Sequence, residues 1–308
     1  MVNTILASLV PVFSVMVLGY IAGLTRDIDN QNIDSLNALV MDFALPAALF
    51  TAMVQTPSSD MIGQAALAAV LVVAMLVTFA MAFAVERYVF AADRRESALL
   101  ALTASGPNVG SAGLPVIAAV FSRSASVSVA VAVAMAAIVV TPLSLLLLES
   151  AGGRRSTPEI LRGALLKPIV VAPVAGLLCS LGGIALPSLL DSGLALMGQG
   201  ASGAALFLTG LVLSAQPVRP SASVGVAAGI KNVLQPLLAG VLAALFLGAT
   251  EARVAVVLTS IPSGAFGVLF AVRYGVPSAR IGTTLIVSTL AGALTLAAAI
   301  VVSGMIWA

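Results

Sequence analysis

The stretch TASGPNVGSAGLPV, residues 103–116, interrupts a run of apolar residues that would otherwise form one long membrane helix. It contains two prolines, three glycines and an asparagine. Proline lacks a backbone donor and disfavours helix at the preceding residue, and glycine adopts backbone angles that other residues resist. Irregular backbone at membrane depth is tolerated only where it is buried in protein or lines a watery cavity. The stretch therefore predicts two half-helices joined by an unwound segment.

The composition of the whole chain is that of an integral membrane protein. Of its 308 residues, 60% are hydrophobic and 8% are charged, whereas roughly 25% are charged in an average soluble domain. About 20 apolar residues cross the ~30 Å core of a bilayer, so we expect an all-α protein with ten transmembrane helices. The first has the features of a retained helix and not of a cleaved signal peptide. The predicted spans are 4–24, 34–54, 62–85, 97–121, 126–148, 160–182, 189–213, 222–248, 253–272 and 279–305.

Arginines are unevenly distributed among the segments that join these spans. The segments after spans 1, 3, 5, 7 and 9 carry most of them, and the other segments carry only Arg123 and Arg253. Since lysine and arginine favour the cytoplasmic side, we expect both termini to face the periplasm or the cell exterior. The chain has no histidine, which excludes a Ser-His dyad and an H-E-x-x-H zinc site. We therefore expect neither an enzyme nor a metal or cofactor site, and no nucleic-acid partner.

The two halves of the chain contain matching segments at nearly the same spacing. Ala-Ala-Leu-Phe occurs at 47–50 and again at 204–207, and a threonine precedes a proline break at both 103–108 and 259–263. These matches predict two repeats of five helices, residues 1–150 and 151–308. Because five is odd, the second repeat would enter the membrane from the opposite side, and such inverted repeats are common in secondary transporters.

The second break has the sequence TSIPSGAFG, residues 259–267. Two broken helices in corresponding positions indicate a transport site near the midplane, where freed amides attract an anion and freed carbonyls attract a cation. The alternative is a pair of proline kinks with glycines for close packing. The predicted substrate-binding residues are Pro107, Asn108, Gly110, Ser111, Gly113, Pro262, Ser263 and Gly264, and Thr103 and Thr259 are candidates for the coupling ion.

A few polar side chains lie within predicted spans and are further candidates. Asp42 could take up a proton or hold sodium, or it could be solvated near a cavity mouth. Lys231 lies deep in its span and could attract the anion, form an ion pair or snorkel, whereas we expect Lys167 to snorkel to the headgroups. Gln199 and Ser202 are candidates for accessory contacts in the site or for hydrogen bonds between helices.

Four segments resemble the auxin efflux carrier family of membrane transporters, which includes plant auxin carriers and bacterial permeases for malonate and malate. The segments are GPNVGSAGLPV (106–116), FALPAALF (43–50), LLKPIVVAPVAGLL (165–178) and GAALFLTGLVLS (203–214). The resemblance implies the crossover architecture shared with bile-acid and sodium/proton transporters, and an organic anion as substrate. The asparagine of the family's first crossover falls on Asn108. Ser263 stands where plant carriers have a second asparagine, which puts the plant substrate in doubt.

These observations predict a secondary active transporter of small carboxylates in the inner membrane of a bacterium. We expect a scaffold of spans 1, 2, 6 and 7 and a core of spans 3–5 and 8–10, which move against each other to give alternating access. A homodimer through the scaffold and coupling to protons or sodium remain open from the sequence. The alternatives are a passive anion channel and a sodium-coupled organic-acid symporter.

Overall fold

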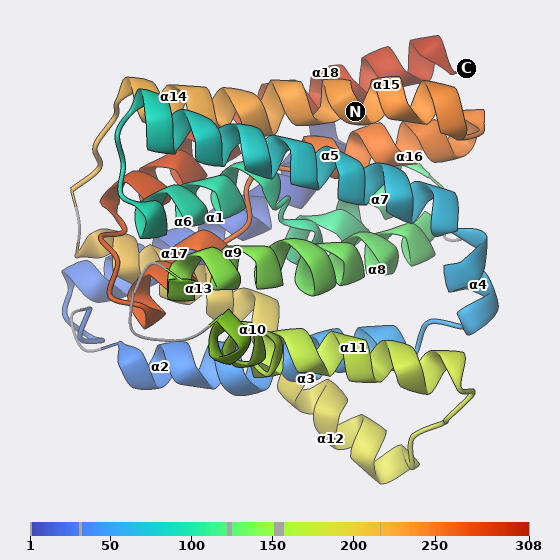
Figure 1. Ribbon diagram of the computed structural model, residues 1–308, viewed down its shortest axis with the longest axis horizontal. Helices are drawn as coiled ribbons and strands as arrows, with labels where there is room; N and C mark the ends of the chain where they lie inside the picture. The colour runs from blue at the N-terminus through green and yellow to red at the C-terminus, as the bar shows by residue number, and fades with distance from the viewer. Residues whose placement is uncertain (1, 31–32, 122–124, 151–156, 216, 308) are drawn as a thin grey trace.

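The computed structural model describes residues 2–30, 33–121, 125–150, 157–215 and 217–307, and these are helical apart from their joints and one isolated β-bridge (Figure 1). The first half contains α1 (Val2–Leu24), α2 (Asp34–Ala38), π-helical η1 (Leu39–Ala44), α3 (Leu45–Val54), α4 (Ser58–Gly63), α5 (Ala65–Ala84), η2 (Val85–Val89), α6 (Arg94–Ser105), η3 (Val109–Gly113), α7 (Leu114–Val120), α8 (Ser126–Met135), η5 (Ala136–Val140) and α9 (Thr141–Ser150). The second half contains α10 (Thr157–Leu165), α11 (Pro168–Leu181), α12 (Ser188–Gln199), α13 (Ala201–Ser214), α14 (Ala222–Gly229), η6 (Ile230–Leu234), α15 (Gln235–Phe246), α16 (Ala249–Ser260), α17 (Phe266–Arg273) and α18 (Ala279–Ile306).

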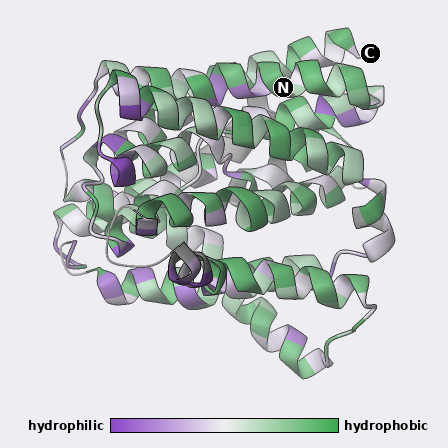
Figure 2. Cartoon of the chain, in the orientation of Figure 1, coloured by the Kyte–Doolittle hydropathy of each residue, from purple (hydrophilic) through white to green (hydrophobic). Residues whose placement is uncertain are grey.

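Long apolar helices dominate the part of the chain that the structure describes (Figure 2). Six helical segments are long and apolar enough to cross a membrane, namely Asp34–Val54, Ala65–Val89, Val127–Ser150, Ser188–Ser214, Ala222–Phe246 and Ala279–Ile306. Two shorter apolar helices, Phe13–Leu24 and Pro168–Leu181, and two interrupted helices lie in the ranges of the remaining predicted spans. The prediction of an all-helical membrane protein is confirmed.

The helices form two groups that are visible in Figure 1. In that view α3, α11 and α12 lie together at the bottom, and α5, α14, α15 and α18 lie at the top. Helix α3 packs against α11 and α12, and α1 packs against α13. In the upper group α5 packs against α6 and α15, while α16 packs against α15 and α18. The interrupted helices therefore belong mainly to the upper group.

Glycine allows α1 and α13 to approach each other closely. A Cβ atom added at Gly19 would collide with the backbone carbonyl of Phe207, and one added at Gly210 would collide with that of Met16. Small residues at such contacts bring helix backbones together in membranes, where dispersion between packed atoms replaces the hydrophobic effect. Helices α1 and α13 are therefore packed tightly against each other.

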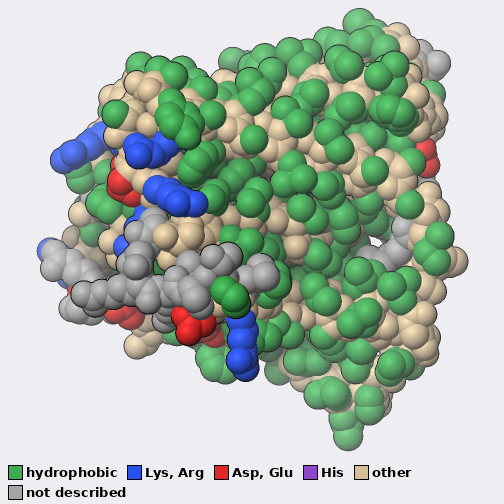
Figure 3. All heavy atoms as spheres, in the orientation of Figure 1, with side chains coloured by type: hydrophobic (Ala, Val, Ile, Leu, Met, Phe, Trp, Pro, Cys, Tyr) green, Lys and Arg blue, Asp and Glu red, His purple; other side chains and the backbone are tan. Residues whose placement is uncertain are grey.

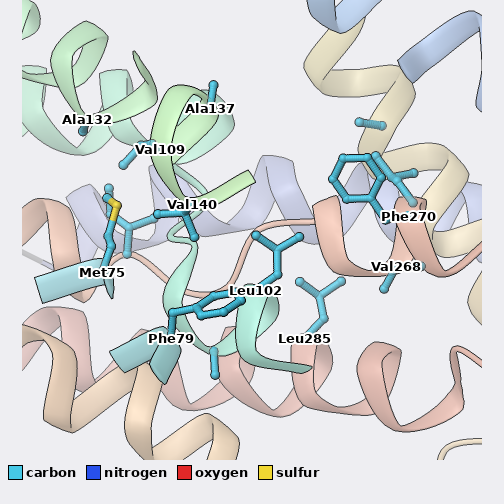
Figure 4. Packing of buried hydrophobic residues seen from close by; sticks show 14 of the residues in the cluster. Met75, Phe79, Leu102, Val109, Ala132, Ala137, Val140, Val268, Phe270 and Leu285 are labelled. Carbon is cyan, nitrogen blue, oxygen red and sulfur yellow. The ribbon is translucent and has the colours of Figure 1, made fainter. Parts of the chain in front are cut away.

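Buried side chains from the upper group hold the first interrupted helix in place (Figure 4). Phe79 and Met75 of α5, Leu102 of α6 and Val140 of η5 are at most 3% exposed. In Figure 4 the ring of Phe79 lies beside Leu102, one turn before the break. Because interiors are close-packed, these side chains hold the last turns of α6 in place up to Ser105, where the helix ends before Gly106 and Pro107.

Charged residues gather at one end of the molecule, on the left in Figure 3. Here the beginning of α18 meets the beginnings of α6 and η2, since Arg280 pairs with Glu96 at 2.6 Å and with Glu86 at 3.6 Å. Ser223, near the beginning of α14, also donates to Glu86 at 2.8 Å. We refer to this end, where Arg273 and Arg280 lie, as the arginine-rich end.

Candidate functional site at the crossing of two interrupted helices

The two helix breaks meet and hydrogen-bond to each other. The backbone N–H of Asn108 donates to the Pro262 carbonyl at 2.8 Å, and the backbone N–H of Gly264 donates to the Gly106 carbonyl at 2.8 Å. These bonds form an antiparallel bridge between Pro107 and Ser263. Backbone groups released by the breaks therefore satisfy one another, which removes much of the cost of unwound backbone in an apolar environment.

Close packing of α6 against α17 supports this crossing. A Cβ atom added at Gly267 would collide with the hydroxyl oxygen of Thr103 and would lie 3.1 Å from the Leu99 carbonyl. The first turn of α17 can therefore approach α6 only because residue 267 is glycine. The sequence pattern predicted that this glycine lies in the second break, but it did not predict that the glycine contacts α6.

A cavity of about 340 Å³ adjoins the crossing. Its floor includes residues 106–110 of the first break and 264–266 of the second. Its walls come from α3, from α8 with η5, and from the junction of α12 and α13. Figure 3 shows the surface hollowed toward the right, away from the arginine-rich end. A concave site between helices, with backbone breaks at its floor, is typical of small-molecule binding.

The structure brings many of the predicted site residues to this cavity, and it places others behind or beside it. The residues that line it are Pro107, Asn108, Gly110, Gly264, Gln199 and Ser202. Those that are not among its lining residues are Gly113, Pro262, Ser263, Thr103, Thr259, Asp42 and Lys231. The side chain of Ser111 lies outside the described part of the structure. Thr141 and Phe266 also line the cavity, and the sequence analysis did not predict them. Phe266 could have been found, because it lies within the second proline-glycine segment.

The two threonines that precede the breaks use their hydroxyl groups within their own helices. Thr103 donates to the Leu99 carbonyl at 2.8 Å, and Thr259 donates to the Ala255 carbonyl at 2.8 Å. Both side chains are buried, with exposures of 1% and 0%. Such bonds to the preceding turn are the usual arrangement for threonine in a helix.

Two side chains from the eighth predicted span reach the carbonyl ends of the first half-helices. Lys231, which is 0% exposed, donates from Nζ to the Thr259 carbonyl at 2.7 Å. Gln235 donates from Nε2 to the Ser105 carbonyl, also at 2.7 Å. The sequence analysis predicted that a cation could bind these carbonyls. In the structure they accept hydrogen bonds from the side chains of Lys231 and Gln235 instead.

A chain of hydrogen bonds ties the second break to α18. The Ser263 amide donates to Oγ of Ser288 at 3.0 Å, and the Ser288 hydroxyl donates to Oδ1 of Asn232 at 2.6 Å. Asn232 returns a bond from Nδ2 to the Ser288 carbonyl at 2.7 Å. Since all three residues are buried, this network attaches the second break firmly to α18 and η6.

On the side of the cavity that faces the arginine-rich end, ion pairs connect the two groups of helices. Asp42 of η1 pairs with Arg273 of α17 at 2.6 Å. The Asp42 side chain is 24% exposed, and the pair lies about one helical turn beyond cavity-lining residues on both helices. Nearby, Lys167 lies 3.7 Å from Glu149, which also accepts a hydrogen bond from the Tyr274 hydroxyl at 3.0 Å. Sequence reasoning assigned Arg273 to a joint and did not pair it with Asp42.

Comparison with known proteins gives the family to which the chain belongs. The sequence profile of a family described as "Membrane transport protein" matches residues 4–300. The chain belongs to this family. It is the family that the resemblance to auxin efflux carriers indicated, and that prediction is confirmed. The protein is therefore a membrane transporter and not an enzyme.

Several relatives align over nearly their whole lengths. "Uncharacterized transporter YfdV" of Escherichia coli (strain K12) is 28% identical over 292 residues, 92% of each chain. "Putative malonate transporter" of Rhizobium meliloti (strain 1021) is 24% identical over 290 residues, 91% of this chain and 90% of the relative. "Uncharacterized transporter" of Methanothermobacter thermautotrophicus is 26% identical over 301 residues, 94% of this chain and 93% of the relative.

Proposed function

We propose that the protein is a secondary transporter of small organic anions that binds a carboxylate at the crossing and carries it by alternating access. The observation that carries this proposal is the pairing of two interrupted helices at the floor of a cavity. The backbone amides of Asn108 and Gly264 serve the pairing itself, and that of Val109 donates to the Pro107 carbonyl. The later amides in the first turns of the resumed helices, from Gly110 and from Ala265 on, are the ones we assign to an anion. The Asn108 side chain adds a neutral donor at the same place.

The packing of helices supports two inverted repeats. If predicted span 1 corresponds to span 6 and span 2 to span 7, the contact of α1 with α13 corresponds to that of α11 with α3, and both are extensive. In the same way the contact of α5 with α6 corresponds to that of α15 with α16. We propose that spans 1, 2, 6 and 7 form the scaffold and that spans 3–5 and 8–10 form the core, with residues 1–150 and 151–308 as the repeats.

The charge distribution supports an orientation. We place the arginine-rich end in the cytoplasm, which puts both termini on the outer side of a bacterial inner membrane. The cavity then faces outward, and the ion pairs of Asp42 with Arg273 and of Lys167 with Glu149 close the inner side. In alternating access these pairs would separate when the site turns inward. A homodimer through the scaffold is compatible with this arrangement.

For energy coupling we propose the proton over sodium. A sodium ion at the carbonyl ends of α6 and α16 would compete with Gln235 and Lys231, which already donate to the Ser105 and Thr259 carbonyls. A proton on Asp42 would neutralise the carboxylate and weaken its pair with Arg273. Protonation would thereby favour opening of the inner side, which links a proton to the conformational change.

Counterflow in proteoliposomes tests transport by a carrier. Vesicles that contain the purified full-length protein are preloaded with an unlabelled carboxylate, and a labelled carboxylate is supplied outside, in parallel assays across mono- and dicarboxylates. A carrier predicts saturable uptake that internal substrate stimulates transiently. Flux that does not saturate and is not stimulated by internal substrate would support a passive anion channel instead.

A further inference from the structure

The cavity at the crossing has no charged side chain among the described residues that line it. Its polar side chains are those of Asn108, Thr141, Gln199 and Ser202, and the other lining residues are apolar or glycine. The ion pair of Asp42 with Arg273 lies about one helical turn beyond the lining residues Leu45 and Leu269, and its opposite charges are 2.6 Å apart. Lys231 is fully buried, donates a hydrogen bond to the Thr259 carbonyl and does not line the cavity. A bound anion therefore meets no side-chain counter-charge.

We infer that the transported substrate is a monocarboxylate with an uncharged, apolar body, and not a dicarboxylate. This inference rests on the proposed function and names the class of acid that the site accepts.

The charge available at the crossing is sufficient for one carboxylate. The beginning of a helix carries roughly half an elementary positive charge, and two helical segments begin at the crossing, the stretch 109–120 and α17. The carbonyl ends of α6 and α16 also meet there, but Gln235 and Lys231 donate to the Ser105 and Thr259 carbonyls and offset their negative charge. The two helix beginnings are then left to balance about one negative charge. A second carboxylate in the same ligand would be removed from water without a cation to pair with it, which is strongly unfavourable.

The walls of the cavity suit a hydrocarbon or aromatic body. Leu45 and Leu49 of α3, Val129 and Val133 of α8, and Phe266 of α17 all contribute to its lining. Contact of a second carboxylate with these side chains would replace water by apolar surface. An aliphatic or aromatic body in the same place would gain the hydrophobic contribution instead.

A matched pair of acids separates the two classes. Hexanoate and adipate have the same six-carbon chain and differ by one carboxylate, and hexanol lacks the charge altogether. Binding to the purified full-length protein is measured as the concentration that half-maximally raises its thermal unfolding midpoint. We expect hexanoate to bind at least tenfold more tightly than adipate or malonate, and hexanol to bind weakly. Equal or tighter binding of adipate or malonate overturns the inference and leaves the proposed function standing, whereas binding by no carboxylate removes both.

A positive charge introduced into the cavity by mutation provides a second test. Gln199 lines the cavity from the scaffold side, and Gln199→Lys supplies the missing cation, with Gln199→Met as the uncharged control. We expect Gln199→Lys to raise the affinity for adipate relative to hexanoate by tenfold or more, and Gln199→Met to leave that ratio unchanged. An unchanged ratio in Gln199→Lys contradicts the idea that cavity charge selects the substrate.

Discussion

Asp42 and Arg273 form an ion pair of 2.6 Å that joins η1 to the last residue of the second interrupted helix. Next to it, Asn37 donates from Nδ2 to the Leu269 carbonyl at 3.2 Å. Both contacts connect the second predicted span to α17, and Leu269 itself lines the cavity. A movement of the crossing relative to α3 must therefore break them, and in the proposed orientation their strength would help to keep the inner side closed.

Exchanging the two charges tests whether the pair closes the inner side. A pair of this exposure is worth about 0.2–1 kcal/mol, so we expect Asp42→Arg or Arg273→Asp alone to change transport rates by several fold. The double variant should recover much of the loss, because it restores a pair of opposite charges. Counterflow rates in proteoliposomes measure this, and a double variant as impaired as the worse single variant would contradict the role of the pair.

Removing the carboxylate of Asp42 tests proton coupling. Asp42→Asn cannot bind or release a proton, so uptake driven by an inward proton gradient should lose its dependence on pH while substrate exchange continues. Asp191→Asn, which changes an acidic residue of α12 outside the cavity, is the control and should retain the dependence. Survival of pH-driven uptake in Asp42→Asn would show that the proton is carried elsewhere or is not carried at all.

Adding one methyl group at the crossing should destabilise the protein. Gly267→Ala places a Cβ atom against Thr103 and the Leu99 carbonyl, and overpacking of this kind costs about 1–3 kcal/mol. Gly225→Ala is the matched control, since no neighbouring heavy atom lies within 4 Å of the added Cβ. Thermal unfolding in detergent should show a lower midpoint for Gly267→Ala alone. Equal midpoints for the two variants would mean that α6 and α17 are not held this closely.

The positions of the two breaks could be predicted from the sequence, because proline and clustered glycines act locally. The pairing of Asn108 with Pro262 could not, since it depends on how helices far apart in the chain are arranged. The same limit applies to Gln235, whose partner, the Ser105 carbonyl, lies on another helix. Hydropathy gives the length of a span, but it does not specify which neighbour each face contacts.

Replacing sodium in the transport buffer tests whether a sodium ion binds the carbonyl ends of α6 and α16 during transport. Because Lys231 donates to the Thr259 carbonyl, we expect equal uptake in sodium and in choline buffers. Lys231→Met leaves that buried carbonyl without its donor, which should cost about 1–3 kcal/mol of stability. Lys167→Met, at a side chain that is 31% exposed, should cost less. Uptake that requires sodium would contradict the proposal that Lys231 and Gln235, and not sodium, occupy these carbonyls.

Whether the substrate binds at the crossing is tested most directly by the affinity of the Asn108→Leu variant. Leucine keeps about the same volume and removes the amide, and the loss of a buried hydrogen bond to a ligand costs about 1–3 kcal/mol, or roughly tenfold or more in affinity. Asn108→Gln retains an amide, and the unfolding midpoints without ligand show that each variant is folded. The measurement is the affinity for a transported carboxylate, by thermal shift and by half-saturation of counterflow. We predict at least a tenfold loss in Asn108→Leu with partial retention in Asn108→Gln, and an unchanged affinity in Asn108→Leu would contradict a substrate site at the crossing.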